Sequence, residues 1–196
     1  MLEKIILLDK QLLVYLNSLG SEQFDLFWLF ITKQSNWTPF FLVLLYFVYK
    51  KLGAKQTGIL LLFITVLLTI NNEITETFKA HFQRLRPCND LDIKNIIRNI
   101  KPSDTFSFFS GHSSNTMAVF VFLLMIFKKH YKYFGFVILW PLIFSYSRIY
   151  LGLHFPTDIL AGYTCGMIMG LLTFQFYKFI QKKFFTPVSP FDVMGL

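Results

Sequence analysis

The sequence carries little charge for its length. Only 15% of the 196 residues are charged, whereas about 25% is usual for soluble globular domains. Hydrophobic residues make up 54% of the chain and aromatic residues 19%. This composition excludes a disordered chain and argues against a water-soluble globule. Apolar stretches divided by short basic patches instead predict a single bundle of membrane helices.

Cysteine and acidic residues are also scarce. The two cysteines, Cys88 and Cys165, provide neither a disulfide framework nor the spacing of a metal site. Asp and Glu number 11 against 19 Lys and Arg, which gives a net charge of +8. Because the chain has so little polar surface, this charge must be concentrated in the loops, where it would attract anionic lipid or a phosphorylated substrate.

Residues 1–18 predict an amphipathic helix that lies in the membrane interface. Charged residues interrupt its leucines and isoleucines, and no small-residue cleavage site follows, which argues against a signal peptide. The apolar run 24–31 is too short to span a bilayer and predicts a second interfacial segment or half of an extra span. We expect one membrane domain over 1–196, with interfacial helices in 1–35 and the core in 36–183.

The rest of the chain predicts an all-α bundle with five or six membrane spans. Several apolar runs are shorter than the roughly 20 residues that a bilayer core requires, so their helices must extend into polar flanks. The runs lie at residues 37–49, 58–70 with a polar continuation toward Lys79, 116–127, 133–146 and 159–180.

Basic residues divide the connections between these runs into two kinds. Short connections carry clusters of lysine, and the positive-inside rule places them in the cytoplasm. These are Lys50, Lys51, Lys55, Lys128, Lys129, Lys132, Lys182 and Lys183. Residues 79–112 and 148–158 then share the opposite side, although the first segment is also basic, and anion binding would explain that charge. The segment's isoleucines recur at helical spacing, which predicts a short helix on the membrane. They are Ile93, Ile96, Ile97 and Ile100.

Three polar clusters fall at the same ends of different predicted spans. They are Lys79 with Arg86-Pro87, Ser110-Gly111-His112, and Ser147-Arg148 with His154 and Asp158. Taken alone, the cations would be lipid-headgroup anchors, the histidines ordinary interfacial residues, and the carboxylate a helix cap. Chance does not readily place all of these groups on one side of the membrane.

This set of side chains matches what phosphoryl transfer requires. Three cations can stabilise the charge on the equatorial phosphoryl oxygens. Ser110 and Gly111 open a helix whose free N–H groups favour an anion, and glycine lets the backbone approach closely. His154 can act as nucleophile if Asp158 fixes its tautomer, and His112 can protonate the leaving alkoxide. This chemistry requires no metal or other cofactor.

The remaining polar candidates have simpler explanations. His130 lies in a basic connection and His81 has no evident partner, so we treat both as structural. Asn72 and Asn115, near the span ends, are typical of hydrogen bonds between packed helices.

The three clusters resemble the motifs of the type 2 phosphatidic acid phosphatase (PAP2) superfamily, which contains membrane lipid phosphatases and soluble vanadium haloperoxidases. The resemblance rests on K-x6-RP at Lys79, FSGH at Phe109 and SR-x5-H-x3-D at Ser147. Each motif alone is moderately specific, whereas all three in order are highly specific. The resemblance covers residues 37–181 and leaves the N-terminal helix unassigned.

The resemblance implies a role for each residue. His154 would attack phosphorus to form a phosphohistidine, Asp158 would orient and activate it, and His112 would be the general acid. Water would then hydrolyse the intermediate. The residues that would hold the phosphate are Lys79, Arg86, Ser110, Gly111 and Arg148. Phe109 departs from the family pattern, which has proline there, so we expect an altered turn and apolar wall with activity retained.

Other classes of protein stay open at this point. The apolar spans argue against a soluble haloperoxidase. A lipid-phosphate binding or transport protein would use the basic pocket without turnover and would need no nucleophile, so His154 with Asp158 is the discriminating feature. A structural membrane protein would make the ordered motif match accidental.

The implied substrate is a lipid phosphate displayed on the non-cytoplasmic face of the membrane. The chain is similar to compact bacterial members of the family, which dephosphorylate undecaprenyl diphosphate, lipid A or phosphatidylglycerol phosphate. On this resemblance alone we expect undecaprenyl diphosphate first, with the other two lipids as alternatives. The expected location is a bacterial inner membrane with the site facing the periplasm or exterior. The expected partners are the lipid substrate and the bilayer, without nucleic acid and with the oligomeric state left open.

Overall fold

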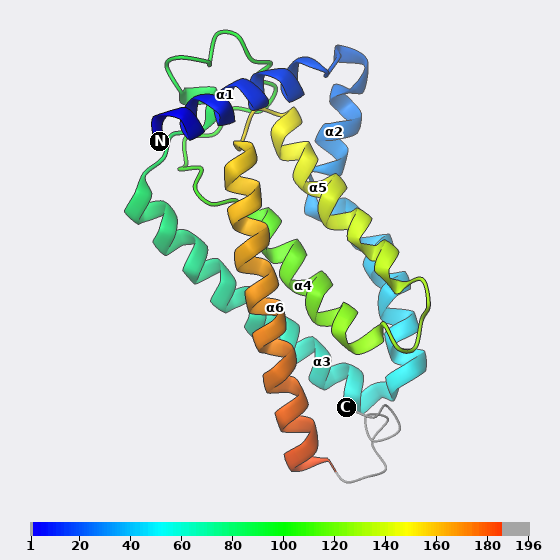
Figure 1. Ribbon diagram of the computed structural model, residues 1–196. Helices are drawn as coiled ribbons and strands as arrows, with labels where there is room; N and C mark the ends of the chain where they lie inside the picture. Colours follow the sequence, from blue (N-terminus) through cyan, green and yellow to red (C-terminus); the bar gives the residue numbers. More distant parts are fainter. Residues whose placement is uncertain (1, 186–196) are drawn as a thin grey trace.

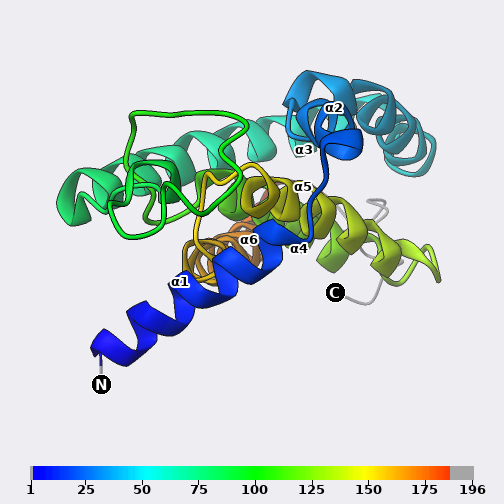
Figure 2. The same ribbon diagram turned by 90° about the horizontal axis from the view of Figure 1, so that it is seen from above.

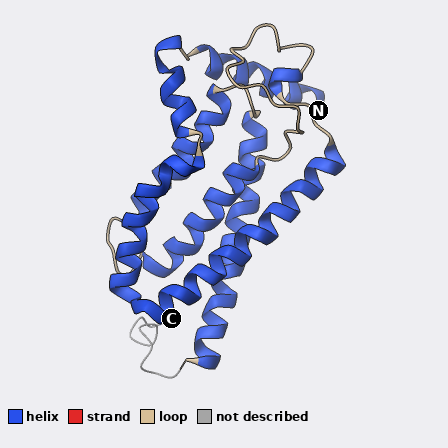
Figure 3. Cartoon of the chain, turned by 180° about the vertical axis from the view of Figure 1, so that it is seen from behind, coloured by secondary structure: helices blue, strands red, loops and turns tan. Residues whose placement is uncertain are grey.

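The computed structural model describes residues 2–185 (Figure 1). Within these residues the chain forms helices and loops and no β-strand (Figure 3), which confirms the predicted all-α fold. The α-helices are α1 Leu2–Ser18, α2 Asp25–Ile31, α3 Thr38–Phe82, α4 Gly111–Phe127, α5 Leu139–Tyr150 and α6 Pro156–Phe184. Short 3-10 helices cover Glu22–Phe24, Gln34–Trp37, Pro87–Asn89 and Phe134–Ile138. Met1 and 186–196, which the predicted single domain includes, lie outside the described residues.

The long element α3 combines two of the predicted spans. Its two arms meet at Gly53, whose φ of 74° and ψ of 172° are readily adopted by glycine alone. Figure 1 shows the chain reversing there, so that one arm runs beside α5 and the other rises past α4 and α6. The predicted runs 37–49 and 58–79 are therefore the two arms of one hydrogen-bonded element.

Helix length and hydropathy identify the membrane-spanning candidates. Two helical segments, Gln34–Asn89 and Pro156–Phe184, are long and apolar enough to cross a bilayer, and Gly111–Phe127 and Phe134–Tyr150 are shorter apolar helices. These segments contain the predicted span runs, apart from Tyr133 at the start of the run 133–146. The count of five or six spans stays a prediction.

The centre of the bundle is the tight packing of α4 against α6. Glycines at every fourth position of α6 allow the two backbones to meet. A Cβ atom at Gly162 would lie 2.6 Å from the carbonyl oxygen of Ser110, and one at Gly170 would lie 2.6 Å from that of Ala118. Small residues at this spacing are a common device for close helix pairing in membranes. The sequence analysis did not predict this interface.

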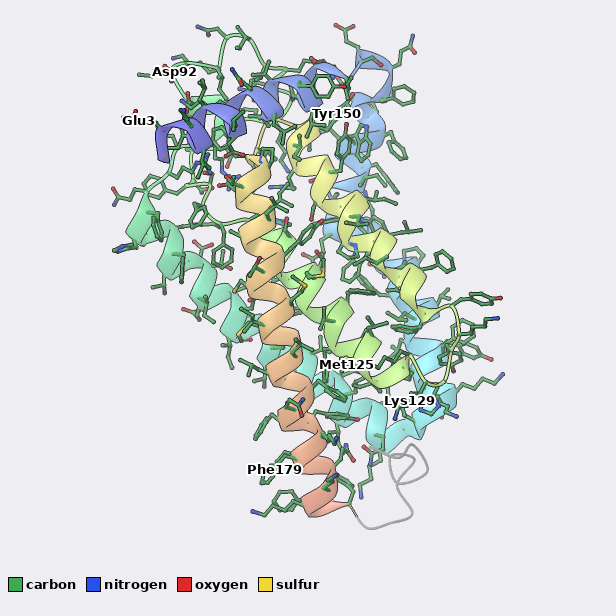
Figure 4. The ribbon with its side chains drawn as sticks, viewed as in Figure 1. Glu3, Asp92, Met125, Lys129, Tyr150 and Phe179 are labelled. Atoms are coloured by element: carbon green, nitrogen blue, oxygen red, sulfur yellow. The ribbon has the colours of Figure 1, made fainter. Side chains whose placement is uncertain are left out.

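The lysine-rich connections gather at one end of the bundle. Lys55, just after the Gly53 turn, lies over the ring of Phe185 at 5.2 Å, and the Tyr131 hydroxyl donates to the carbonyl oxygen of Phe47 over 3.2 Å. Figure 4 shows Lys129 at this end and Tyr150 at the other. The predicted grouping of these connections on one side is therefore found in the fold.

Helix α1 lies across the opposite end of the bundle (Figure 2), where it contacts α5 and α6. Leu13 is fully buried on its inner face, whereas Leu8 is 63% exposed. The Asn17 side chain donates to the carbonyl oxygen of Tyr150 over 2.8 Å. A helix thus exists where it was predicted and is fastened to the bundle, whereas its position in the membrane interface stays a prediction.

Helix α2 runs differently from α1. It packs along α5 and leads through Gln34–Trp37 into the first arm of α3 (Figure 1). Its direction is that of a span, not of a helix lying across the bundle end. The division of the domain at residue 35 stays a prediction.

The predicted surface helix near residues 93–100 is wrong. Residues 91–97 form hydrogen-bonded turns, closed by bonds such as that from the Ile97 amide to the carbonyl oxygen of Ile93 over 3.2 Å. Ile93 and Ile97 are buried against Leu13 of α1. The spacing of Ile93 and Ile97 therefore reflects packing under α1, which a sequence pattern cannot distinguish from a membrane-facing helix.

Candidate active site

The three predicted motifs meet at the end of the bundle that α1 covers. The backbone amide of Ser110 donates to the carbonyl oxygen of Asp158 over 3.0 Å, which joins the second motif to the third. Arg86 of the first motif donates from Nη1 to the carbonyl oxygen of Leu153 over 2.9 Å. Residues far apart in sequence thus converge on the loop between α5 and α6.

His154 is buried in this loop, and its Nε2 atom lies 3.1 Å from Nη1 of Arg86. A guanidinium group can only donate hydrogen bonds, so Nε2 must accept and the ring proton must reside on Nδ1. Burial lowers the pKa of His154 well below its usual value, and the charges of Arg86, Arg148 and Lys79 lower it further. The imidazole is therefore neutral, with its lone pair on Nε2.

Asp158 is fully buried in the first turn of α6. Its Oδ2 accepts the backbone N–H of Phe155 over 2.9 Å and lies 3.4 Å from Nδ1 of His154. Its Oδ1 accepts from Nη1 of Arg84 over 2.7 Å. Asp158 is thus both a helix cap and the carboxylate that faces the proton-bearing nitrogen of His154. The helix-cap explanation and the predicted role beside His154 therefore do not exclude each other.

The two arginines of the motifs are buried and held by threonines. Arg86 donates from Nη2 to the hydroxyl of Thr105 over 2.8 Å, and Arg148 donates from Nη1 to the hydroxyl of Thr32 over 2.7 Å. Among the described residues, Nε of Arg148 is buried without a hydrogen-bond partner. An unpaired buried donor is costly, and an anion at this point would satisfy it.

His112 and Lys79 line a polar cavity of about 220 Å³ beside this cluster. The ring of His112 stacks on Phe144 with 5.6 Å between centroids. The Lys79 ammonium lies 2.7 Å from a carboxylate oxygen of Glu76. Other lining residues include Gln34, Trp37, Asn72, Gly111 and Asn115.

Ser110 and Gly111 have clear structural roles at the start of α4. Ser110 is the N-cap, and its hydroxyl oxygen accepts from the backbone and side chain of Ser113 over 3.4 Å and 2.9 Å. A Cβ atom at Gly111 would lie 2.9 Å from Cγ2 of Thr75 on α3. Gly111 therefore permits close packing of α4 on α3, in addition to the backbone approach that the sequence analysis expected.

The residues that the sequence analysis treated as structural make contacts typical of packing, although Asn72 and Asn115 also line the cavity. The His81 ring packs on Phe82 with 5.0 Å between centroids, and His130 lies in the turn after α4. Asn115 donates to the side-chain oxygen of Asn72 over 2.7 Å between α4 and α3. Phe109, which stands in place of proline, is buried beside Phe78.

The sequence analysis missed Arg84, Asp9, Thr32 and Thr105. Arg84 falls inside the spacer of the first motif, and Asp9 is one of two acidic residues in α1, with Glu3. A charged residue on the inner side of an amphipathic helix was the available signal, because such a charge must be paired when buried. Within residues 2–185, no group of three or more His, Cys, Asp or Glu side chains is placed to hold a metal ion.

A second, apolar cavity of about 330 Å³ adjoins the polar one. The two share Gln34, Asn115, Thr116 and Trp140 in their linings. Leucines and aromatic residues of α3 and α4 form the rest of the apolar wall. A cavity with polar lining thus lies next to an apolar one, an arrangement that suits an amphiphilic ligand.

The model of the PAP2 superfamily matches residues 57–182 of this sequence. The chain belongs to the PAP2 superfamily. It is 31% identical over 188 residues to a lipid A 4'-phosphatase of Bacteroides thetaiotaomicron, a match that covers 93% of this chain and 81% of the relative. It is 30% identical over 139 residues to an undecaprenyl-diphosphatase of Sulfolobus acidocaldarius, covering 71% of this chain and 62% of the relative.

A solved structure shares the fold. The first transmembrane PAP2-type phosphatidylglycerolphosphate phosphatase from Bacillus subtilis superimposes with a TM-score of 0.70 at 20% identity, covering 93% of this chain and 90% of that chain. The family resemblance and the helical membrane fold are confirmed. The chain is a membrane lipid phosphatase of the PAP2 type.

Proposed function

We propose that His154 is the nucleophile of this phosphatase. The observation that carries the proposal is the position of its Nε2 atom, which accepts a hydrogen bond from Arg86 while Nδ1 faces Asp158. When a phosphate group enters, its oxygens replace Nε2 as the acceptors for Arg86, and the lone pair of Nε2 is released toward phosphorus. One exchange of hydrogen bonds thus pairs Arg86 with the phosphate and frees Nε2 of His154 to attack.

The reaction follows as two in-line displacements. Nε2 of His154 forms a bond to phosphorus while the bond to the leaving oxygen breaks, and His112 donates a proton to that oxygen. Asp158 stabilises the positive charge on the imidazole through its contact with Nδ1. Water then attacks the phosphohistidine, His112 accepts the water's proton, and inorganic phosphate leaves with Nε2 restored.

Five residues hold the phosphate in this proposal. Arg86, Arg148 and Lys79 supply positive charge, and the unpaired Nε donor of Arg148 supports its part. Ser110 and Gly111 begin α4, whose free N–H groups and dipole favour an anion.

We further propose that the substrate is a sugar-containing lipid phosphate of the lipid A type. The match to a lipid A 4'-phosphatase extends over 93% of this chain. The polar cavity also presents the amides of Gln34 and Asn72 and the ring of Trp37 beside Lys79, and amides with aromatic rings suit a sugar's hydroxyl groups and faces. Undecaprenyl diphosphate, the first expectation from sequence, is the second candidate because of the match to the undecaprenyl-diphosphatase.

We place the enzyme in a bacterial inner membrane with the site facing the periplasm. The lysine-rich end of the bundle lies opposite the site and would face the cytoplasm. Lys94→Cys and Lys182→Cys, each introduced into a chain with serine at positions 88 and 165, report the two ends. An impermeant thiol reagent added to intact cells stripped of their outer membrane should label position 94 alone. Labelling of position 182 alone would reverse the orientation.

One assay tests the nucleophile and the substrate together. His154→Ala should abolish phosphate release from every lipid in a panel of lipid A, undecaprenyl diphosphate, phosphatidylglycerol phosphate and phosphatidic acid. His130→Ala, far from the cluster, is the matched control and should release phosphate at the wild-type rate. Unchanged release by His154→Ala would refute the nucleophile. A wild-type kcat/KM highest for undecaprenyl diphosphate would select the second candidate.

A further inference from the structure

We propose that Asp9 of α1 is a positioning residue for Asp158 and acts through Arg84 and the first turn of α6. The inference rests on the proposed role of Asp158 toward His154. It gives the N-terminal helix, which lies outside the three motifs and outside residues 57–182 of the family match, a part in the reaction.

Asp9 is buried, with 4% of its surface exposed, and every described contact of its carboxylate leads toward Asp158. Oδ1 accepts the backbone N–H of Thr157 over 2.9 Å. Oδ2 accepts from Nη2 of Arg84 over 2.7 Å and also from the Thr157 hydroxyl. Thr157 precedes Asp158 in the first turn of α6, so Asp9 caps that turn from another helix.

Arg84 connects the two carboxylates directly. Its Nη1 atom donates to Asp158 over 2.7 Å while Nη2 donates to Asp9, and its guanidinium carbon lies 3.9 Å above the ring of Phe155. The planar fork and the ring beneath it fix the orientation of both carboxylates. Oδ2 of Asp158 is thereby held toward His154.

The charges along this chain favour the proposed intermediate. Asp9 and Asp158 carry two negative charges and Arg84 one positive charge, so these three residues place a net negative charge on the Nδ1 side of His154, opposite Arg86 at Nε2. The imidazole becomes positively charged when Nε2 bonds to phosphorus, and the net negative charge stabilises that state. If Asp9 were neutral, Arg84 would cancel the charge of Asp158 and this stabilisation would be lost.

Other residues fasten α1 to the bundle without involving Asp9. Asn17 donates to the carbonyl oxygen of Tyr150, and Lys10 lies 2.8 Å from Asp90 and 2.7 Å from Asp92. Lys10 is the immediate neighbour of Asp9 and makes no described contact with Arg84 or the first turn of α6. It therefore provides a matched control for loss of a polar contact from the same helix.

The test compares Asp9→Asn, Lys10→Gln, Arg84→Gln and the Asp9→Asn/Arg84→Gln double variant, each as full-length protein in detergent. Asp9→Asn keeps an oxygen for the Thr157 amide but turns neutral toward Arg84. We expect its kcat to fall about tenfold, the lower range seen when a partner that orients a reacting group is removed. KM should stay within about twofold, because Asp9 does not line the cavity. Lys10→Gln should keep both constants.

The double variant separates positioning from simple anchoring. If Asp9 acts through Arg84, the losses of kcat are not additive, and adding Asp9→Asn to Arg84→Gln causes no further decrease. A wild-type kcat for Asp9→Asn, or an equal loss from it in both backgrounds, would overturn the proposal. Asp158→Asn is assayed in parallel. Full activity in that variant would instead refute the proposed role of Asp158.

Discussion

Arg86 donates a hydrogen bond from Nη1 to Nε2 of His154 over 3.1 Å, and this contact sets the tautomer of the imidazole. The same guanidinium is held by the carbonyl oxygen and hydroxyl of Thr105, at 2.9 Å and 2.8 Å. Its plane is therefore fixed before substrate arrives. A preorganised donor beside the nucleophile needs little rearrangement when a phosphate enters.

Arg86→Lys tests whether the geometry of this donor matters beyond its charge. Lysine keeps the charge, but its single nitrogen cannot occupy the separate positions from which Nε, Nη1 and Nη2 of Arg86 donate. We expect kcat/KM to fall about a hundredfold, as is common when a fixed charge-stabilising donor is lost. Arg98→Lys is the control, because Nη2 of Arg98 donates to both carboxylate oxygens of Asp25, over 2.7 Å and 2.9 Å, away from the cluster. Equal losses in both variants would indicate general destabilisation.

The depressed pKa of His154 predicts how activity depends on pH. Burial, and then the charges of Arg86, Arg148 and Lys79, lower this pKa well below its usual value near 6.5. Nε2 therefore keeps its lone pair as the pH falls to 6.5, and protonation removes it only in more acidic solution. The acidic limb of kcat/KM, which reports the free enzyme, should lie below pH 6.5.

Arg86→Gln tests the direction in which the charge of Arg86 shifts the pKa of His154. Loss of a positive charge makes protonation of His154 easier, so its pKa rises and the acidic limb should move to higher pH. The ionisation of the free substrate is the same for both proteins, so the difference between the two profiles reports the change in the enzyme. Coincident limbs would show that His154 does not control this part of the profile.

The sequence motifs predicted which side chains would gather, because the chemistry of phosphoryl transfer fixes the intervals between them. A nucleophile, its orienting carboxylate and the cations must occur at fixed intervals at helix ends, and Arg86, His154 and Asp158 meet as that spacing predicts. The helical fold was also predictable, because apolar runs of membrane length admit little else.

Contacts between distant segments could not be predicted in this way. Nothing local in sequence shows that Asp9 lies against Thr157, since the pairing depends on where α1 crosses the bundle. The isoleucines at 93 and 97 were misread for the same reason, because α1 covers them. The glycines of α6 were visible at their spacing, but only the structure shows that α4 is the helix that they face.

Gly166→Ala tests the packing of α4 on α6. The added Cβ would collide with the carbonyl oxygen of Ser114, and backbone atoms cannot rotate away, so the helices must separate. We expect a loss of about 1–3 kcal/mol, the usual cost of overpacking, seen as a lower thermal midpoint in detergent. Gly58→Ala is the matched control, because its Cβ meets nothing within 4 Å and alanine favours a helix. An unchanged midpoint for Gly166→Ala would show that α4 and α6 can separate without loss of stability.

Glu76→Gln tests whether Lys79 is restrained before substrate binds. The Lys79 ammonium lies 2.7 Å from Glu76, whose side chain is 69% exposed, so phosphate must compete with a partly solvated ion pair. Such pairs contribute about 0.2–1 kcal/mol, and freeing Lys79 should lower KM by up to about fivefold with kcat unchanged. Glu73→Gln removes the same charge one turn earlier, at a residue that does not line the cavity. A KM lowered equally by both changes would assign the effect to overall charge, whereas a raised KM for Glu76→Gln alone would mean that Glu76 contacts the substrate.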